Sequence, residues 1–115
     1  MLGSAGSPVL SFQDAMTVHV LRAHGVIYSE LTRLFGANPG RFHEILSGKL
    51  YPGSWEAAVD ALMQDDFWHP AVARLVELLG RNHVLATVQA ASPTKRRFQQ
   101  ELKRLRRSSL VHSVS

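Results

Sequence analysis

The feature that most constrains the fold of this chain is the return of apolar residues every three or four positions between glycine and proline residues. In the first such segment this spacing places one set of residues on a single helical face: Phe12, Met16, His19, Val20 and Ala23. The sequence contains no alternating pattern of any length, which a half-buried strand would require. The sequence therefore predicts an all-α fold.

Residues that start and stop helices predict the boundaries. Ser11 followed by Asp14 is typical of a capping box. Ser54, His69-Pro70, Asn82 and Ser92-Pro93 are expected to open later helices, and the predicted stops are glycines, at Gly25, Gly36, Gly48 and Gly80. The segment 84–88 alone could be a short strand, but no pairing partner is evident.

The same spacing predicts which residues of the later helices face inward. They are Ile27, Leu31, Leu34, Phe35, Phe42, Ile45, Leu46, Trp55, Ala58, Val59, Leu62, Met63, Val72, Leu75, Val76 and Leu79. His19 is expected to be a core histidine with a hydrogen-bond partner. Phe98, Leu102 and Leu105 form an apolar seam on the last helix.

These signals divide the chain into three parts. Residues 1–10 are rich in Gly and Ser and are expected to form a flexible tail. Residues 11–91 are expected to form one helical domain, in which a three-helix head (about 11–50) is backed by a helical scaffold (54–91). Residues 92–115 are expected to form a basic C-terminal helix and tail.

Positive charge is concentrated near the C-terminus. Residues 1–94 hold six Lys/Arg and eight Asp/Glu, a net of −2, whereas residues 95–107 hold seven Lys/Arg and one Glu, a net of +6. The sum is the net charge of +4 for the chain. A basic segment of this kind suits a polyanion such as nucleic acid, although it is also compatible with a solvated basic helix.

Residues 27–48 have the pattern of a helix-turn-helix. A short helix ends at Gly36, which permits a sharp turn, and a second helix begins at Asn38-Pro39. Phe42 and Ile45 are expected to lock this second helix onto Leu31 and Phe35. Its opposite face would then be able to meet a DNA major groove.

The candidate DNA-binding residues come from that face and from the basic segment. They are Asn38, Gly40, Arg41, His43, Glu44, Ser47, Lys49, Lys95, Arg96, Arg97, Lys103, Arg104, Arg106 and Arg107. His43 and Glu44 are expected near base edges, and a carboxylate can accept a hydrogen bond from the cytosine amino group. Alternatively, Glu44 pairs with Arg41 on the helix surface. Gly40 would allow close approach near the helix N-terminus, where the helix dipole favours phosphate.

The stretch ELTRLFGANPGRFHEILSGKLYPGS resembles the helix-turn-helix of small bacterial and phage regulators. The matching elements are Phe35-Gly36, Asn38, Phe42, Ile45-Leu46 and Gly48-Lys49, and the resemblance covers about residues 27–53. It implies DNA binding in transcription regulation, often as a homodimer or higher homo-oligomer. The chain departs from the pattern at Thr32, where the family usually has Ala, and at Ile27, where it usually has a Ser or Thr cap. The Thr32 hydroxyl therefore needs a hydrogen-bond partner.

Other classes of function have weaker support. The sequence has no cysteine, no HExxH, no GxSxG and no glycine-rich phosphate loop after a strand, so we expect neither an enzyme nor a cofactor. Asp65, Asp66 and His69 form a polar cluster, but capping explains it better than a metal site. No secretory signal or membrane span is evident, and we expect a cytoplasmic protein. An oligomeric nucleic-acid packaging subunit and a protein-interaction module remain as alternatives.

Overall fold

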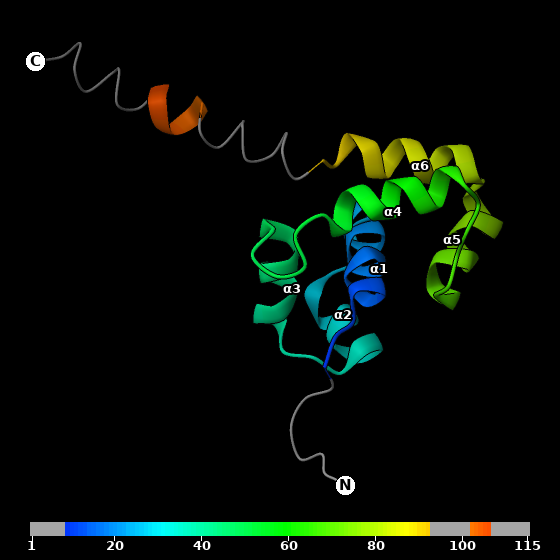
Figure 1. Cartoon of the computed structure of the whole chain (residues 1–115), viewed down its shortest axis with the longest axis horizontal. Coiled ribbons are helices and arrows are strands. Elements are labelled where there is room, and N and C mark those ends of the chain that lie inside the picture. Colours follow the sequence, from blue (N-terminus) through cyan, green and yellow to red (C-terminus); the bar gives the residue numbers. More distant parts are fainter. Residues whose placement is uncertain (1–8, 93–101, 107–115) are drawn as a thin grey trace, which may run out of the picture.

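The computed structural model describes residues 9–92 and 102–106, and every regular element in these ranges is a helix (Figure 1). The helices are α1 (Phe12–Ala23), α2 (Tyr28–Phe35), α3 (Pro39–Ser47), α4 (Ser54–Met63), α5 (Pro70–Leu79) and α6 (Arg81–Ala90). Residues 102–106 form a further short helical stretch. The all-α prediction is confirmed, and segment 84–88 is helical within α6. None of the described helices has the length and apolar character needed to cross a membrane.

Local signals placed most helix starts correctly. The Ser11 hydroxyl accepts a hydrogen bond from the Asp14 N–H at 3.1 Å, and the Asp14 carboxylate accepts one from the Ser11 N–H at 2.9 Å. This closes the predicted capping box. Asn38 caps α3 through its side chain, and His69 caps α5 through Nδ1, which accepts from the Ala71 N–H at 3.0 Å.

Two predicted caps are wrong. Gly53 precedes α4 with φ 87°, so Ser54 is the first helical residue. Gly80 precedes α6 with φ 89°, so Asn82 lies inside that helix. Glycine adopts a positive φ without the clash that a Cβ atom would cause, and both helices therefore begin one or two residues earlier than the polar residue suggests.

Helix α1 lies at the centre of the molecule and packs against α3, α4, α5 and α6. Its Ala15, Val18 and Leu21 belong to the cluster built with α2 and α3, whereas Val20 belongs to the cluster built with α4, α5 and α6. The single apolar face predicted for this helix is therefore too narrow, because a helix between two layers is buried on both sides. α1 joins the head to the scaffold.

Five apolar residues predicted to lie on the apolar faces are exposed instead: Phe12, Ile27, Leu34, Met63 and Leu79. Each lies at the margin of an apolar stripe whose centre is covered. In α2, for example, Leu31 is fully buried while Leu34 is more than a third exposed. Periodicity identifies the stripe, but the size of the neighbouring helices decides how much of its width is covered.

The ordered domain begins before residue 11. Leu10 is only 6% exposed and packs in the cluster with Phe42 and Ile45. Its carbonyl accepts a hydrogen bond from the Tyr51 hydroxyl, and the Tyr51 ring meets Phe12 edge-on with centroids 6.0 Å apart. The prediction that residue 10 belongs to a flexible tail is therefore wrong, because a side chain far along the sequence holds it.

Candidate nucleic-acid interface

The turn between α2 and α3 has the conformation that a helix-turn-helix requires. Gly36 ends α2 in the left-handed conformation, with φ 70° and ψ 13°. Ala37 then points inward and is 2% exposed, and Asn38 returns to an extended conformation before α3. The chain thus reverses direction over three residues and sets α3 against both α1 and α2.

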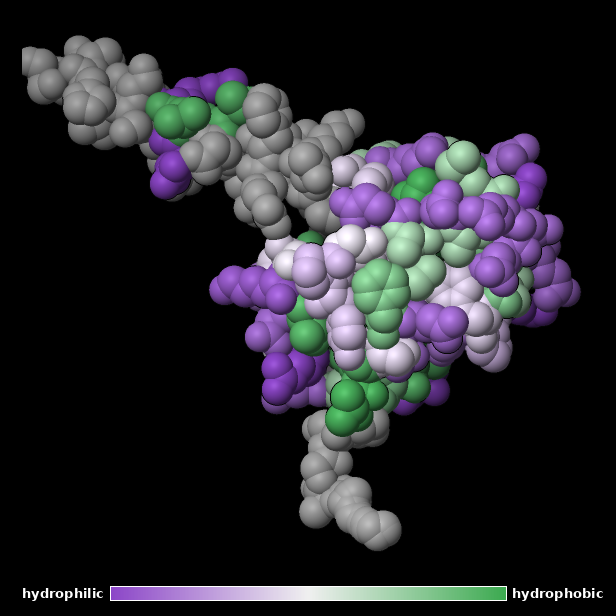
Figure 2. All heavy atoms as spheres, viewed as in Figure 1, coloured by the Kyte–Doolittle hydropathy of each residue, from purple (hydrophilic) through white to green (hydrophobic). Residues whose placement is uncertain are grey.

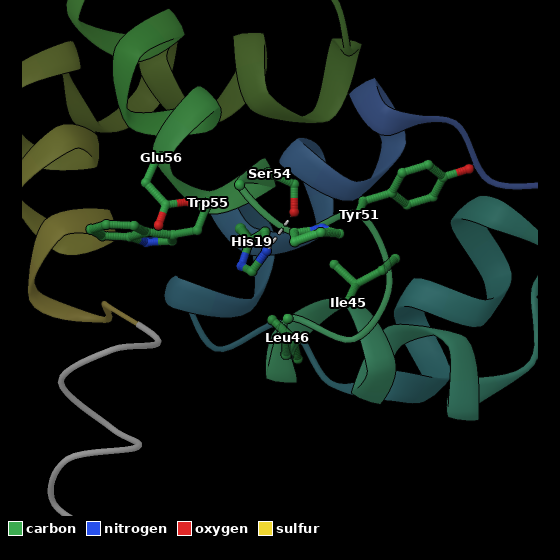
Figure 3. Close-up of a pocket in the computed structure, with 10 residues that line it drawn as sticks. His19, Ile45, Leu46, Tyr51, Ser54, Trp55 and Glu56 are labelled. Carbon is green, nitrogen blue, oxygen red and sulfur yellow. Dashed lines mark hydrogen bonds between the residues drawn. The ribbon is translucent and has the colours of Figure 1, made fainter.

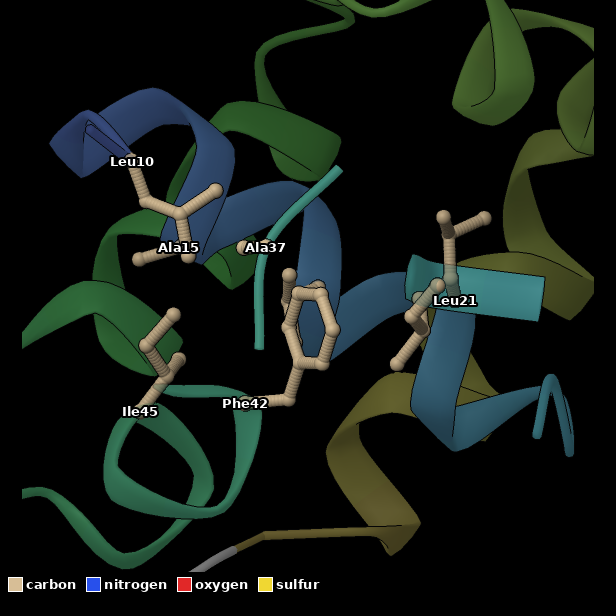
Figure 4. Packing of buried hydrophobic residues seen from close by; sticks show 8 residues of the cluster. Leu10, Ala15, Leu21, Ala37, Phe42 and Ile45 are labelled. Atoms are coloured by element: carbon tan, nitrogen blue, oxygen red, sulfur yellow. The ribbon is translucent and has the colours of Figure 1, made fainter. Parts of the chain in front are cut away.

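The two central residues on the inner face of α3 are completely buried. Phe42 and Ile45 both have 0% exposure, and Figure 4 shows them turned into the core beside Ala15 of α1. The Phe42 ring lies 6.2 Å from that of Phe35 and 6.4 Å from that of Tyr28, measured between centroids. Aromatic contacts at these separations add to the hydrophobic gain of burial, so α3 is held firmly.

The outer face of α3 is open to solvent. Five predicted residues along or beside this face are exposed: Asn38, Gly40, Arg41, His43 and Lys49. Glu44 and Ser47 are half-buried. Figure 2 shows strongly hydrophilic side chains along the left-hand edge of the molecule, where α3 lies. The structure therefore brings together the seven predicted residues of the helix-turn-helix on one side of the domain.

The N-terminus of α3 is already hydrogen-bonded. The Gly40 N–H donates to Asn38 Oδ1 at 2.8 Å, and the Arg41 N–H donates to the Asn38 carbonyl at 2.9 Å. Pro39 has no N–H. These residues therefore offer no unpaired backbone donor to a phosphate, unlike the helix end that the sequence suggested. A Cβ atom on Gly40 would lie 3.2 Å from Asn38 Oδ1, so the glycine also accommodates the cap.

Arg41 and Glu44 form an ion pair on the outer face. Arg41 Nη1 lies 2.9 Å from Glu44 Oε1, with 60% and 40% of the two side chains exposed. On α2, Arg33 pairs with Glu30 in the same arrangement, and this hydrogen bond holds the pKa of the Glu30 carboxyl below its usual value. Both exposed pairs contribute little to stability.

A groove of about 740 Å³ runs beside the outer face of α3. Its walls are Val9, Leu10, Asn38, Gly40, Arg41, Glu44, Leu50 and Tyr51. Sequence reasoning missed Tyr51, which holds a left-handed conformation (φ 53°) that is uncommon for a residue with a side chain. Its only signal in the sequence was the Tyr51-Pro52-Gly53 turn.

A smaller pocket of about 190 Å³ lies behind α3, between its C-terminal end and the start of α4. Figure 3 shows the Ser54 hydroxyl directed at the His19 ring, with Ile45 and Leu46 on the α3 side. His19 Nε2 and Ser54 Oγ are 3.0 Å apart, and both residues are buried. The predicted core histidine with a partner is confirmed.

Thr32 carries an unmet hydrogen-bonding group. Its Oγ1 is buried and has no hydrogen-bond partner in the part of the chain that the structure describes, at the position where the resembled family usually has Ala. The hydrogen-bond partner expected for this hydroxyl is therefore missing among the described residues. A buried hydroxyl without a partner lowers the stability of the folded state by about 1–3 kcal/mol. Thr32→Ala removes that hydroxyl, so the folded structure tolerates the substitution.

The basic C-terminal segment is described in part. Lys103, Arg104 and Arg106 lie in the helical stretch 102–106 and are exposed, as are Leu102 and Leu105. Lys95, Arg96, Arg97, Phe98 and Arg107 lie outside the described residues. The predicted apolar seam is solvent-exposed where the structure describes it.

Among residues 9–92 and 102–106, no three His, Asp or Glu side chains are arranged to hold a metal ion. His69 uses Nδ1 to cap α5.

Comparison with known proteins finds no matching family model, no similar curated protein and no similar solved structure.

Proposed function

We propose that this chain binds duplex DNA, with α3 lying in the major groove, and acts in the cytoplasm as a transcription regulator. The observation that carries the proposal is the two-sided character of α3. Its inner residues Phe42 and Ile45 are fully buried, while its outer face presents Arg41, His43 and Ser47 without bulky apolar side chains. A helix held rigidly on one side and polar on the other is suited to reading a groove.

The charges beside α3 suit phosphate contacts from side chains. Arg41 is near the N-terminal end of the helix, and Lys49 follows its C-terminal end. These cations would meet phosphates on either side of the groove. Since residues 1–94 carry a net charge of −2, most of the remaining attraction would come from residues 95–107.

The Arg41–Glu44 pair suggests how the face would change on binding. A phosphate near Arg41 would compete for its guanidinium, and Glu44 would then be able to accept a hydrogen bond from a cytosine amino group. The exposed pair is weak enough to open at little cost.

The fold contains a matched control for this site. Arg74 and Glu77 form an ion pair on α5 with the same spacing in the sequence, 3.5 Å apart and 65% and 69% exposed. Arg41→Ala and Arg74→Ala therefore remove one cation each from similar surroundings, on two different faces. Fluorescence anisotropy with a labelled random-sequence duplex at several salt concentrations compares them.

We expect Arg41→Ala to weaken binding and to reduce the slope of log affinity against log salt by about 0.9, the contribution of one phosphate. We expect Arg74→Ala to change neither quantity. Selection of bound duplexes from a random pool should also yield a common sequence. Equal effects of the two substitutions, or no enriched sequence, would contradict groove reading by α3.

Apolar side chains on the scaffold suggest a second candidate function, that of a protein-interaction module. Met63, Leu78 and Leu79 are exposed, and the Arg81 guanidinium donates to the Met63 carbonyl at 3.2 Å, which brings the end of α4 beside the α5–α6 junction. Exposed apolar residues that gather in this way favour protein contact. Light scattering after size exclusion gives the mass in solution, and the anisotropy measurement gives DNA binding; together they separate three outcomes. A dimer favours the regulator, a large ring favours the packaging subunit, and a chain that does not bind DNA favours the interaction module.

A further inference from the structure

Two histidines distant in the sequence meet where the end of α1 lies beside the start of α6. His24 is the C-terminal cap of α1, and His83 lies in the first turn of α6. Their ring centroids are 6.2 Å apart, with the ring planes inclined by 40°. Helices α1 and α6 pack against each other, so the fold holds this pair together.

His24 has a buried nitrogen that the protein does not satisfy. Its Nε2 is inaccessible to solvent and has no hydrogen-bond partner among residues 9–92 and 102–106. Buried polar atoms are nearly always hydrogen-bonded, and an exception requires an explanation. A bound metal ion would supply this explanation, because it accepts the lone pair of an imidazole nitrogen.

The separation of the rings is compatible with one shared metal ion. Zn–N bonds are about 2.0–2.1 Å long, so a coordinating ring has its centroid roughly 3 Å from the ion, and two such centroids lie about 5–6 Å apart. The observed 6.2 Å is therefore within a small side-chain rotation of that distance. His83 is exposed and has room to make this movement.

The electrostatics of the pair also favour a cation bound by neutral imidazoles. A metal ligand must be a neutral imidazole, and burial, with the nearby His83 as a smaller cause, lowers the pKa of His24. His24 lies at the C-terminal end of α1, where the helix dipole attracts positive charge. The neighbouring Arg22 guanidinium is engaged with the Val26 carbonyl at 3.1 Å and with the Tyr28 ring.

We propose that His24 and His83 form a two-histidine site for a divalent transition-metal ion of the Zn²⁺, Ni²⁺ or Cu²⁺ type, with water completing the coordination once the exposed His83 ring has rotated. Imidazole nitrogen suits these ions, whereas Mg²⁺ and Ca²⁺ prefer oxygen ligands. Such a bridge would join the end of α1 to the start of α6. The proposal does not depend on DNA binding by α3.

To test the proposal, Zn²⁺ is titrated into the full-length protein. Binding is measured by calorimetry and by NMR of the histidine ring protons. We expect one ion per chain, with the His24 and His83 resonances shifting first. His83→Ala, which removes an exposed side chain, and His24→Ala should each weaken binding by at least about tenfold, since even indirect ligand partners contribute this much. His43→Ala is the control, because it removes an exposed histidine on α3 and should leave Zn²⁺ affinity unchanged.

The thermal midpoint gives an independent measurement. Zn²⁺ should raise it for the parent chain and for His43→Ala, and should have no such effect in His83→Ala, because a ligand that binds only the folded state stabilises it. Circular dichroism confirms that each variant is folded before titration. Unchanged Zn²⁺ affinity in His83→Ala, or first shifts at other histidines, would overturn the proposal. Absence of binding at hundreds of micromolar Zn²⁺ would also overturn it.

Discussion

Phe42 is the residue that most directly determines how α3 is held. It is fully buried among Leu31, Phe35 and Ile45, and its position in the middle of α3 makes it the contact between this helix and the rest of the head. The residue was identified from spacing alone. What spacing could not show is that its ring also meets Tyr28, because that contact depends on how α2 starts.

Truncation of Phe42 tests this role. We expect Phe42→Ala to lower the free energy of unfolding by about 3–5 kcal/mol, the usual cost of removing a buried phenylalanine ring. Phe12→Ala is the matched control, because Phe12 is 40% exposed and its contact with Tyr51 contributes only about 1 kcal/mol. Urea denaturation monitored by circular dichroism measures both. Similar losses in the two variants would show that Phe42 is not at the centre of the head.

Glu44 separates base recognition from simple surface pairing. If it contacts a cytosine, Glu44→Ala should relax preference at one base pair by about 1–3 kcal/mol and should tighten non-specific binding as a negative charge leaves. If it only pairs with Arg41, preference should not change. Glu77→Ala removes the equivalent carboxylate from α5 and is the control. A panel of single-base substitutions in the selected site distinguishes the two roles, and a uniform shift across the panel would refute base recognition.

At the scale of elements, α2, the turn and α3 could be predicted closely from the sequence. Gly36, Asn38 and Gly48 act within one helical turn of their own positions, so their conformations do not depend on the rest of the fold. The start of α4 could not be predicted in this way. Ser54 has the chemistry of a cap, but its hydroxyl interacts with His19 instead.

The basic C-terminal segment has its own prediction. Removal of residues 94–115 should weaken DNA binding for all sequences alike and flatten the salt dependence, because each lost phosphate contact lowers the slope by about 0.9. The preferred sequence should stay the same, since we propose that α3 reads the bases. Anisotropy titrations at several salt concentrations compare the full and shortened chains. Retention of both affinity and slope would assign the segment to a protein partner or to solubility.

At the scale of the whole molecule, the head and the scaffold share one helix. Val18 of α1 belongs to the cluster under α2 and α3, and Val20 belongs to the cluster under α4, α5 and α6. The sequence suggested a head of residues 11–50 backed by a scaffold, and the boundary between the two passes through α1. The two parts should therefore unfold together.

A fragment of residues 9–53 tests this cooperativity. Without α4, α5 and α6 it would expose Val20 and the His19 ring, and the one cluster that remains is a small core for a chain this short. We expect weak helical signal and no cooperative melt by circular dichroism. The chain of residues 1–93 is the control and should melt in one sharp transition. A fragment that melts cooperatively near the temperature of that control would show that the head is an independent domain.

The sequence by itself determined the helical class of this protein, the boundaries of α2 and α3, and the buried pair Phe42 and Ile45. Those features depend on residues within about one helical turn of each other, and such signals are readable along the chain. The tertiary structure alone decided the burial of α1 on two sides and the contact of Tyr51 with Leu10. It also decided the meeting of His24 with His83. Those partners are separated by many helical turns, and only the packing of whole helices brings them into contact.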